Sequence, residues 1–154
     1  MNAAQQGSHG ATTATAIGRA GLHVGLPLVL GVLAYVAWRS TDVRVVAWVS
    51  RIAPHGASAV RNAGSSALAR VPALIAGSLP DAAWGWAFGA ALALVWRGRS
   101  WREKRAWMGS GAMVALAAEL GQAVHVVPGT YDHADLAAIA LGYVLGALLA
   151  GRAA

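Results

Sequence analysis

Long apolar segments alternate along the chain with shorter segments that carry arginine. The first, Ala20–Trp38, has no charged residue and is flanked by Arg19 and Arg39. Its 19 residues are close to the roughly 20 that an apolar helix needs to cross a bilayer core. A secretory signal peptide is the alternative, but the preceding tail is too long and Ala-Trp-Arg-Ser is a poor cleavage site. We therefore expect a retained transmembrane helix, kinked at Pro27.

Three further apolar segments follow in the second half of the chain, each with one internal charge. They are Leu79–Trp96, Ala106–Val124 and Ala134–Ala150. The first of these opens with Pro80 and Asp81, and both residue types favour the start of a helix. Glu119 is the only charge in the next one. The pattern predicts an all-α, polytopic membrane protein with four transmembrane helices.

Ser40–Val71 has a different pattern. Arg44 and Arg51 are seven residues apart and share one helical face, while Asn62–Ser66 is rich in glycine and serine. We expect a short amphipathic helix in the membrane interface and then a loop, with a second short helix near Ala57–Val71. A solvated loop is the alternative, because the helical period is imperfect.

Composition supports a membrane protein. Apolar residues make up 57% of the chain and charged residues 12%, about half the share of a soluble domain. No cysteine is present, which excludes a disulfide framework and a thiolate site. The net charge of +6 does not indicate nucleic acid, because the arginines flank apolar segments, where they meet lipid phosphates. We expect a disordered tail at residues 1–17 and one four-helix membrane domain at 18–154.

The distribution of basic residues predicts the orientation. Arg97–Arg105 holds five positive charges in nine residues, the densest basic run of the chain. The positive-inside rule makes it cytoplasmic, so four spans place both termini in the cytoplasm of a multi-pass protein. The sparser arginines from Arg39 to Arg70 then lie outside, among lipid head groups.

This topology brings most of the few acidic residues to the extracytoplasmic ends of the spans. Glu119 lies about 12 Å of helix before the end of the third span, inside the hydrocarbon, and Gln122 shares its face. Asp81 starts the second span from the same side, and Asp132 and Asp135 start the fourth. We expect these residues to converge on one outer-leaflet pocket.

Each of these side chains also has a purely structural interpretation. Asp81 suits a helix N-terminus, and Asp132 with Asp135 resembles a capping box. Glu119 could be a protonated acid that bonds to Gln122, although an acid at membrane depth usually faces a cavity or partner. Two small-residue pairs also predict close packing of the second and fourth spans: Gly85/Gly89 and Gly142/Gly146.

The motifs of the second half follow an ordered series. They are Ser78-Leu79-Pro80-Asp81 with Trp84, Glu119-x-x-Gln122, Pro128-Gly129-Thr130-Tyr131-Asp132, and Asp135-Leu136 with Gly142. Over roughly Leu79–Ala150 this series resembles the VanZ-like family of small membrane proteins, named for a protein linked to teicoplanin resistance. Many members carry an arginine in the turn and an asparagine in the last helix, where this chain has Thr130-Tyr131 and Ala140-Leu141, so it resembles a divergent branch. The resemblance implies four or five membrane helices and an envelope role, with no settled activity.

The main hypothesis is an envelope protein whose acidic pocket binds a lipid head group, a cell-wall precursor, a glycopeptide or a cation. Its binding residues are expected to be Glu119, Gln122, Asp132, Asp135, Asp81, Thr130 and Tyr131. The alternatives are a structural subunit of a membrane complex, as a homo- or hetero-oligomer, and a metal-dependent enzyme on a lipid-linked substrate. We do not expect an enzyme, a cofactor or a bound metal, because no nucleophile motif or compact ligand spacing is present. A proton or ion transporter is less favoured, since no second intramembrane charge is evident.

Overall fold

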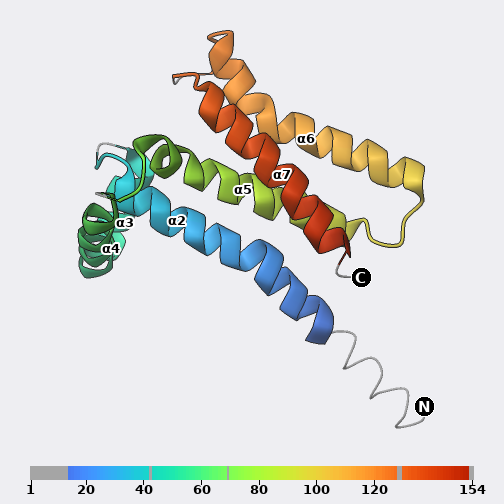
Figure 1. Cartoon of the computed structure of the whole chain (residues 1–154), viewed down its shortest axis with the longest axis horizontal. Helices are drawn as coiled ribbons and strands as arrows, with labels where there is room; N and C mark the ends of the chain where they lie inside the picture. Colours follow the sequence, from blue (N-terminus) through green and yellow to red (C-terminus); the bar gives the residue numbers. More distant parts are fainter. Residues whose placement is uncertain (1–13, 42, 69, 128–129, 153–154) are drawn as a thin grey trace.

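A computed structural model describes residues 14–41, 43–68, 70–127 and 130–152, and these are helical apart from short connections (Figure 1). No strand occurs within those ranges. The elements are η1 (Gly21–Gly25), α2 (Leu26–Trp38), α3 (Arg44–Ile52), α4 (Pro54–Leu68), α5 (Ala73–Val95), α6 (Trp101–Ala123) and α7 (His133–Arg152). The prediction of an all-α fold is confirmed for the described part of the chain.

The first long helix runs without interruption from Ala14 to Trp38. Ala14–Ile17, which composition assigns to a disordered tail, are therefore helical, and residues 1–13 lie outside the described ranges. In place of a simple kink at Pro27, a π-helical segment, η1, comes before α2, and the N–H of Leu26 bonds to the carbonyl of Gly21. A proline removes one helical N–H and crowds the preceding turn, and a local π-bulge accommodates both effects.

The segment after α2 is more helical than its sequence predicts. The expected amphipathic helix is present as α3, and the second short helix expected near Ala57–Val71 is present as α4 and includes Asn62–Ser66. The loop expected between them is reduced to a break at Ala53. The hydroxyls of Ser65 and Ser66 bond to the Asn62 carbonyl, which satisfies these polar groups within the helix. Arg61 donates to the carbonyls of Val36 (3.0 Å) and Arg39 (2.9 Å) and so caps the end of α2.

Helix α5 begins at Ala73, two turns before the predicted start, so the expectation that Pro80 and Asp81 open this helix is wrong. Pro80 lies in the helix interior and is buried. The N-terminal interpretation of Asp81 fails with it, because Asp81 lies in the third turn. Asp81 is therefore a charge in the interior of a long helix.

Helix α6 begins inside the predicted basic loop. The Ser100 side chain and Glu103 form a reciprocal capping box, which starts the helix at Trp101. Arg102, Lys104 and Arg105 consequently lie on the first helical turns. The Ser-x-x-Glu spacing in the sequence was the available signal for this start.

Helices α5 and α7 form the most extensive contact of the fold. A β-carbon on Gly85 or Gly89 would collide with the backbone of Ile139 or Tyr143, and one on Gly142 or Gly146 would collide with that of Ala82 or Trp86. The predicted close packing through these two glycine pairs is confirmed. Helix α6 packs more loosely across the pair, with Ala115 against Ile139 and Tyr143.

Two helices, Ala14–Trp38 and His133–Arg152, are long and apolar enough to cross a membrane. Helices α5 and α6 have 23 residues each but do not meet the same criterion, so the prediction of four spans is not confirmed. Pro80 and Asp81 lower the mean hydropathy of α5, and Glu119 and Gln122 lower that of α6. In Figure 1, α2 ends beside the start of α5, while the connection between α5 and α6 lies at the opposite end.

Candidate functional site

Arg39 joins three helices at one end of the fold. This residue caps the C-terminus of α2, and its Nη2 lies 3.6 Å from Oδ2 of Asp81 on α5 and 3.8 Å from Oδ2 of Asp135 on α7. Both distances exceed hydrogen-bonding range, so these contacts are loose ion pairs. Nη2 also donates to the Gly77 carbonyl at 3.4 Å, and Nε is buried without a partner. The guanidinium therefore has unused donor capacity.

Asp135 is the most tightly held carboxylate of this group. The Ser78 hydroxyl donates to its Oδ1 at 2.7 Å, a distance typical of a charge-assisted bond. Its side chain is 16% exposed, against 31% for Asp81 and 39% for Arg39. We call Arg39, Ser78, Asp81 and Asp135 the polar cluster. Asp135 therefore ties α7 to α5, and its capping-box role stays a prediction.

Glu119 is the one charged residue buried in the described part of the chain, at 9% exposure. It follows Gly111 and Ala115 at four-residue steps, so it continues the face of α6 that packs on α5 and α7. Its Oε2 has no hydrogen-bond partner, and its charge acts on Asp81. An unpaired buried carboxylate oxygen is costly unless a proton or ligand satisfies it.

The other predicted site residues lie at the turn before α7. The Asp132 carboxylate is exposed and accepts the N–H of Ala134 at 2.8 Å, which is N-cap geometry. The Tyr131 hydroxyl lies 2.9 Å from Nδ1 of His133, and Thr130 is exposed. Gln122 is half-buried one turn beyond Glu119. Pro128 and Gly129 lie outside the described residues.

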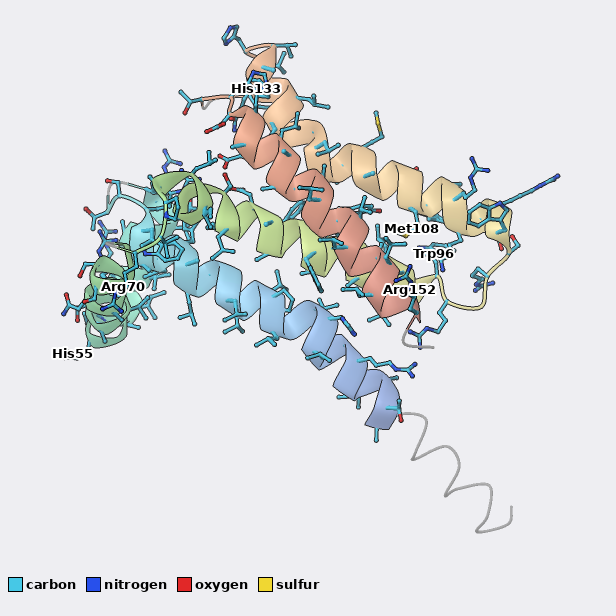
Figure 2. All side chains as sticks on the ribbon, in the orientation of Figure 1. His55, Arg70, Trp96, Met108, His133 and Arg152 are labelled. Carbon is cyan, nitrogen blue, oxygen red and sulfur yellow. The ribbon has the colours of Figure 1, made fainter. Side chains whose placement is uncertain are left out.

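The structure therefore brings Asp81 and Asp135 together, places Glu119 within electrostatic range, and gives Asp132 a capping contact. Sequence reasoning did not assign Arg39 and Ser78 to the site. Arg39 was noted as the flank of an apolar segment and among the sparser arginines expected outside, and Ser78 as the first residue of the Ser78-Leu79-Pro80-Asp81 motif. Figure 2 shows His133 at the end of α7 opposite to Arg152, so the turn and the basic C-terminal end are well separated. Among the described residues, no three His, Asp or Glu side chains are grouped so as to hold a metal ion.

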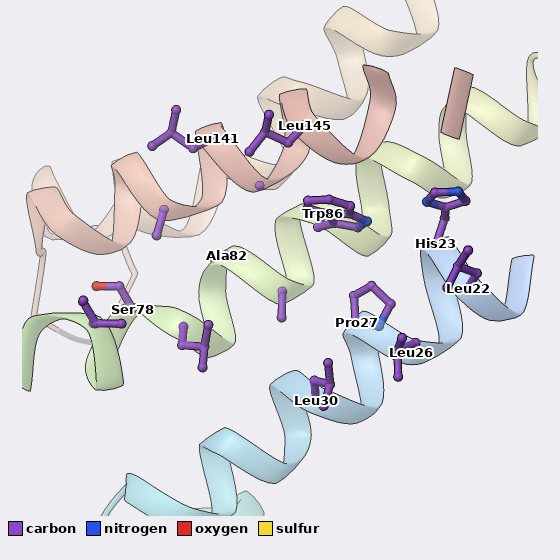
Figure 3. Close-up of a pocket in the computed structure, with 15 residues that line it drawn as sticks. Leu22, His23, Leu26, Pro27, Leu30, Ser78, Ala82, Trp86, Leu141 and Leu145 are labelled. Carbon is purple, nitrogen blue, oxygen red and sulfur yellow. The ribbon is translucent and has the colours of Figure 1, made fainter. Parts of the chain in front are cut away.

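An apolar groove of about 800 Å³ lies between the first helix, α5 and α7. Figure 3 shows Leu26 and Leu30 on one side, Leu141 and Leu145 on the other, and Ser78 toward one end. The groove thus reaches the polar cluster through the hydroxyl that bonds Asp135. A second pocket of about 280 Å³ on the other side of α2 contains Asp81.

Comparison of the chain with family models, curated proteins and solved structures found no match. The VanZ-like resemblance stays a prediction from the sequence.

Proposed function

We propose that the chain is a four-span, VanZ-like membrane protein of the cell envelope that binds a polar ligand group at the extracytoplasmic ends of α2, α5 and α7. The observation that carries this proposal is the position of Arg39 between Asp81 and Asp135. These charges come from three helices and meet at one point. A lipid head group, a cell-wall precursor, a glycopeptide or a cation would engage them.

The energetics of the polar cluster favour a binding role. Asp81 lies eight residues after the start of α5, about 12 Å along the helix, so it sits below the membrane surface in this arrangement. Charged groups at such depth are costly and usually mark a cavity or ligand site. A purely structural ion pair would gain from short, bidentate hydrogen bonds, whereas the pairs here are 3.6 and 3.8 Å apart. These long contacts leave hydrogen-bonding capacity of the guanidinium and the carboxylates free for a ligand.

Four spans are supported by length and packing. Helices α5 and α6 exceed the roughly 20 residues needed to cross the core. Helix α5 packs along α7, itself apolar enough to span. Large apolar side chains are exposed on the outer faces, including Leu74, Val95, Met113 and Val114, as expected where lipid is the solvent. The basic residues between α5 and α6 favour a cytoplasmic position for that connection.

Cysteine labelling tests this topology, because the chain has no native cysteine. In intact cells, a cysteine in place of Thr130 should react with a membrane-impermeant maleimide. One in place of Arg99 should react only after the cells are permeabilised. Equal labelling of both positions from outside would contradict the four-span arrangement.

Two isosteric substitutions test the binding role. Glu119→Gln and Asp135→Asn should leave the protein folded in the membrane and abolish its envelope phenotype, such as a change in glycopeptide susceptibility on expression. Glu103→Gln is the matched control, because Glu103 lies at the other end of α6 and only caps that helix. Full activity of both site variants would refute the proposal.

A second candidate, proton or cation transfer, gains from one observation. Asp81 and Asp135 join Glu119 as charges within long helices, so more than one intramembrane charge is present in this arrangement. Proton flux in proteoliposomes separates the two candidates. Transfer requires a flux that Glu119→Gln abolishes, whereas ligand binding requires none.

A further inference from the structure

The apolar groove has the length of one membrane leaflet. Along α5 its lining runs from Ile75 to Trp86, a rise of eleven residue steps or about 17 Å of helix. Half of a bilayer core is about 15 Å thick. In the four-span arrangement the groove therefore starts near the head groups and stops near the bilayer midplane. This is the depth that one lipid chain of the outer leaflet occupies.

The groove is open sideways and is apolar along its length. The leucines on its two rims are 40–64% exposed and would face lipid: Leu22, Leu26, Leu30, Leu79, Leu141 and Leu145. Its floor contains small residues, among them Ala82, Ala138 and Gly142. The volume of about 800 Å³ lies within the range of small-molecule sites, roughly 300–1,000 Å³. A chain entering from the bilayer would not have to displace any part of the protein.

The polar cluster at the Ser78 end carries charges of both signs. The Arg39 side chain is partly exposed and its guanidinium has unused donors, which suit a phosphate. Asp81 and Asp135 together carry two negative charges against the one positive charge of Arg39, and this excess suits an ammonium group. An anionic head group without an amine would meet two uncompensated carboxylates. Charge complementarity therefore selects a zwitterion with phosphate and ammonium groups.

We infer that the groove binds one acyl chain of a zwitterionic, ammonium-bearing phospholipid of the extracytoplasmic leaflet. Its phosphate contacts Arg39 and its ammonium contacts Asp135, whose hydrogen-bond partner Ser78 lines the groove. This inference rests on the proposed function and specifies the ligand class. A helix from a second copy fits less well, because 20 residues of helix, about 30 Å long and 10–12 Å wide, fill several times the groove volume.

The test uses the full chain, delipidated in detergent, with phosphatidylethanolamine and phosphatidylglycerol of identical chains as probes. Native mass spectrometry measures the affinity for each lipid. Ala138→Phe fills the groove from its floor, and Leu141→Trp fills it from an exposed rim where the fold tolerates bulk. The matched control is Ala137→Phe, on the exposed face of α7 and outside the groove. Asp135→Asn removes one charge of the polar cluster.

The wild type should bind phosphatidylethanolamine at least about tenfold more tightly than phosphatidylglycerol, the size of one charge-assisted hydrogen bond. Both filling variants should lose affinity for both lipids, the control should not, and Asp135→Asn should lose the preference. Equal affinities in the wild type, or binding that the folded filling variants retain, would overturn the inference. So would a lipid-free dimer that Leu141→Trp dissociates. The cysteine labelling and the Glu119→Gln phenotype judge the proposed function separately, since neither depends on a lipid in the groove.

Discussion

The guanidinium of Arg39 lies 3.6 Å from the carboxylate of Asp81 and connects the end of the first long helix to the third turn of α5. Arg39 Nη2 also donates to the carbonyl of Gly77, and the segment between these two residues contains α3 and α4 and returns the chain to the same end of the fold. The ion pair therefore joins two parts of the chain that are far apart in sequence. It also holds Asp81 in the polar cluster, of which Ser78 lines the groove.

Replacing Arg39 with a neutral residue should impair ligand binding much more than it lowers the stability of the fold. Both side chains are about a third exposed, so Arg39→Gln should lower the free energy of unfolding by only about 0.5–1 kcal/mol. A double-mutant cycle with Asp81→Asn in detergent measures the coupling of the pair. Arg39→Gln should nevertheless remove lipid or ligand binding. A loss of several kcal/mol would show instead that the ion pair is mainly structural.

Replacing glycine by alanine should have opposite effects at Gly146, which lies in the contact between α5 and α7, and at Gly109, which lies in open space on α6. Gly146→Ala places a methyl group against the backbone of Trp86 and should destabilise the protein by about 1–3 kcal/mol. Gly109→Ala, in α6, meets nothing within 4 Å and should stabilise by up to about 1 kcal/mol through helix propensity. Thermal unfolding in the same detergent compares them. Equal melting temperatures would contradict the close packing.

His125 adopts a left-handed backbone conformation with φ of 59°. It ends α6 in a Schellman motif, in which the N–H of Val126 bonds to the carbonyl of Gly121 at 2.9 Å. His125→Gly should stabilise the protein by about 1 kcal/mol, because glycine adopts this conformation without steric cost. His125→Ala is the control and should give no gain. A stabilisation by both would point to a side-chain effect.

The capping box at the start of α6 predicts an acid-sensitive end of that helix. The hydrogen bonds from the hydroxyl and backbone N–H of Ser100 lower the pKa of Glu103 below its ordinary value of 4.5. Stability from this depressed pKa is present above 4.5 and is lost as the pH falls through the lower, folded-state value. Ser100→Ala should return the pKa to the ordinary value and weaken the pH dependence. NMR titration measures the pKa of the Glu103 carboxyl in the wild type and in Ser100→Ala. An unshifted wild-type pKa would contradict the capping geometry.

Local sequence patterns predicted which helices exist better than they predicted where each helix begins and ends. The apolar segments and the amphipathic period of Arg44–Ile52 are visible in sequence because hydrophobicity and helical spacing depend only on residue type and neighbouring residues. The start of α5 was misplaced because Pro80 is usually a helix-opening residue, whereas here it is buried in the helix interior. The second short helix expected near Ala57–Val71 is present as α4. Glycine and serine in Asn62–Ser66 are weak helix formers, and tertiary contacts such as Trp38 Nε1 to the Gly64 carbonyl (3.1 Å) outweigh that tendency.

The sequence alone predicts an all-helical fold, glycine pairs suited to close packing, and acidic residues within long apolar segments. These properties follow from residue type and short-range spacing. The partners of those acids do not: Arg39, Ser78, Asp81 and Asp135 lie up to 96 positions apart, and only the packing of α2, α5 and α7 brings them together. The groove likewise exists only between helices, since its shape depends on how three surfaces meet.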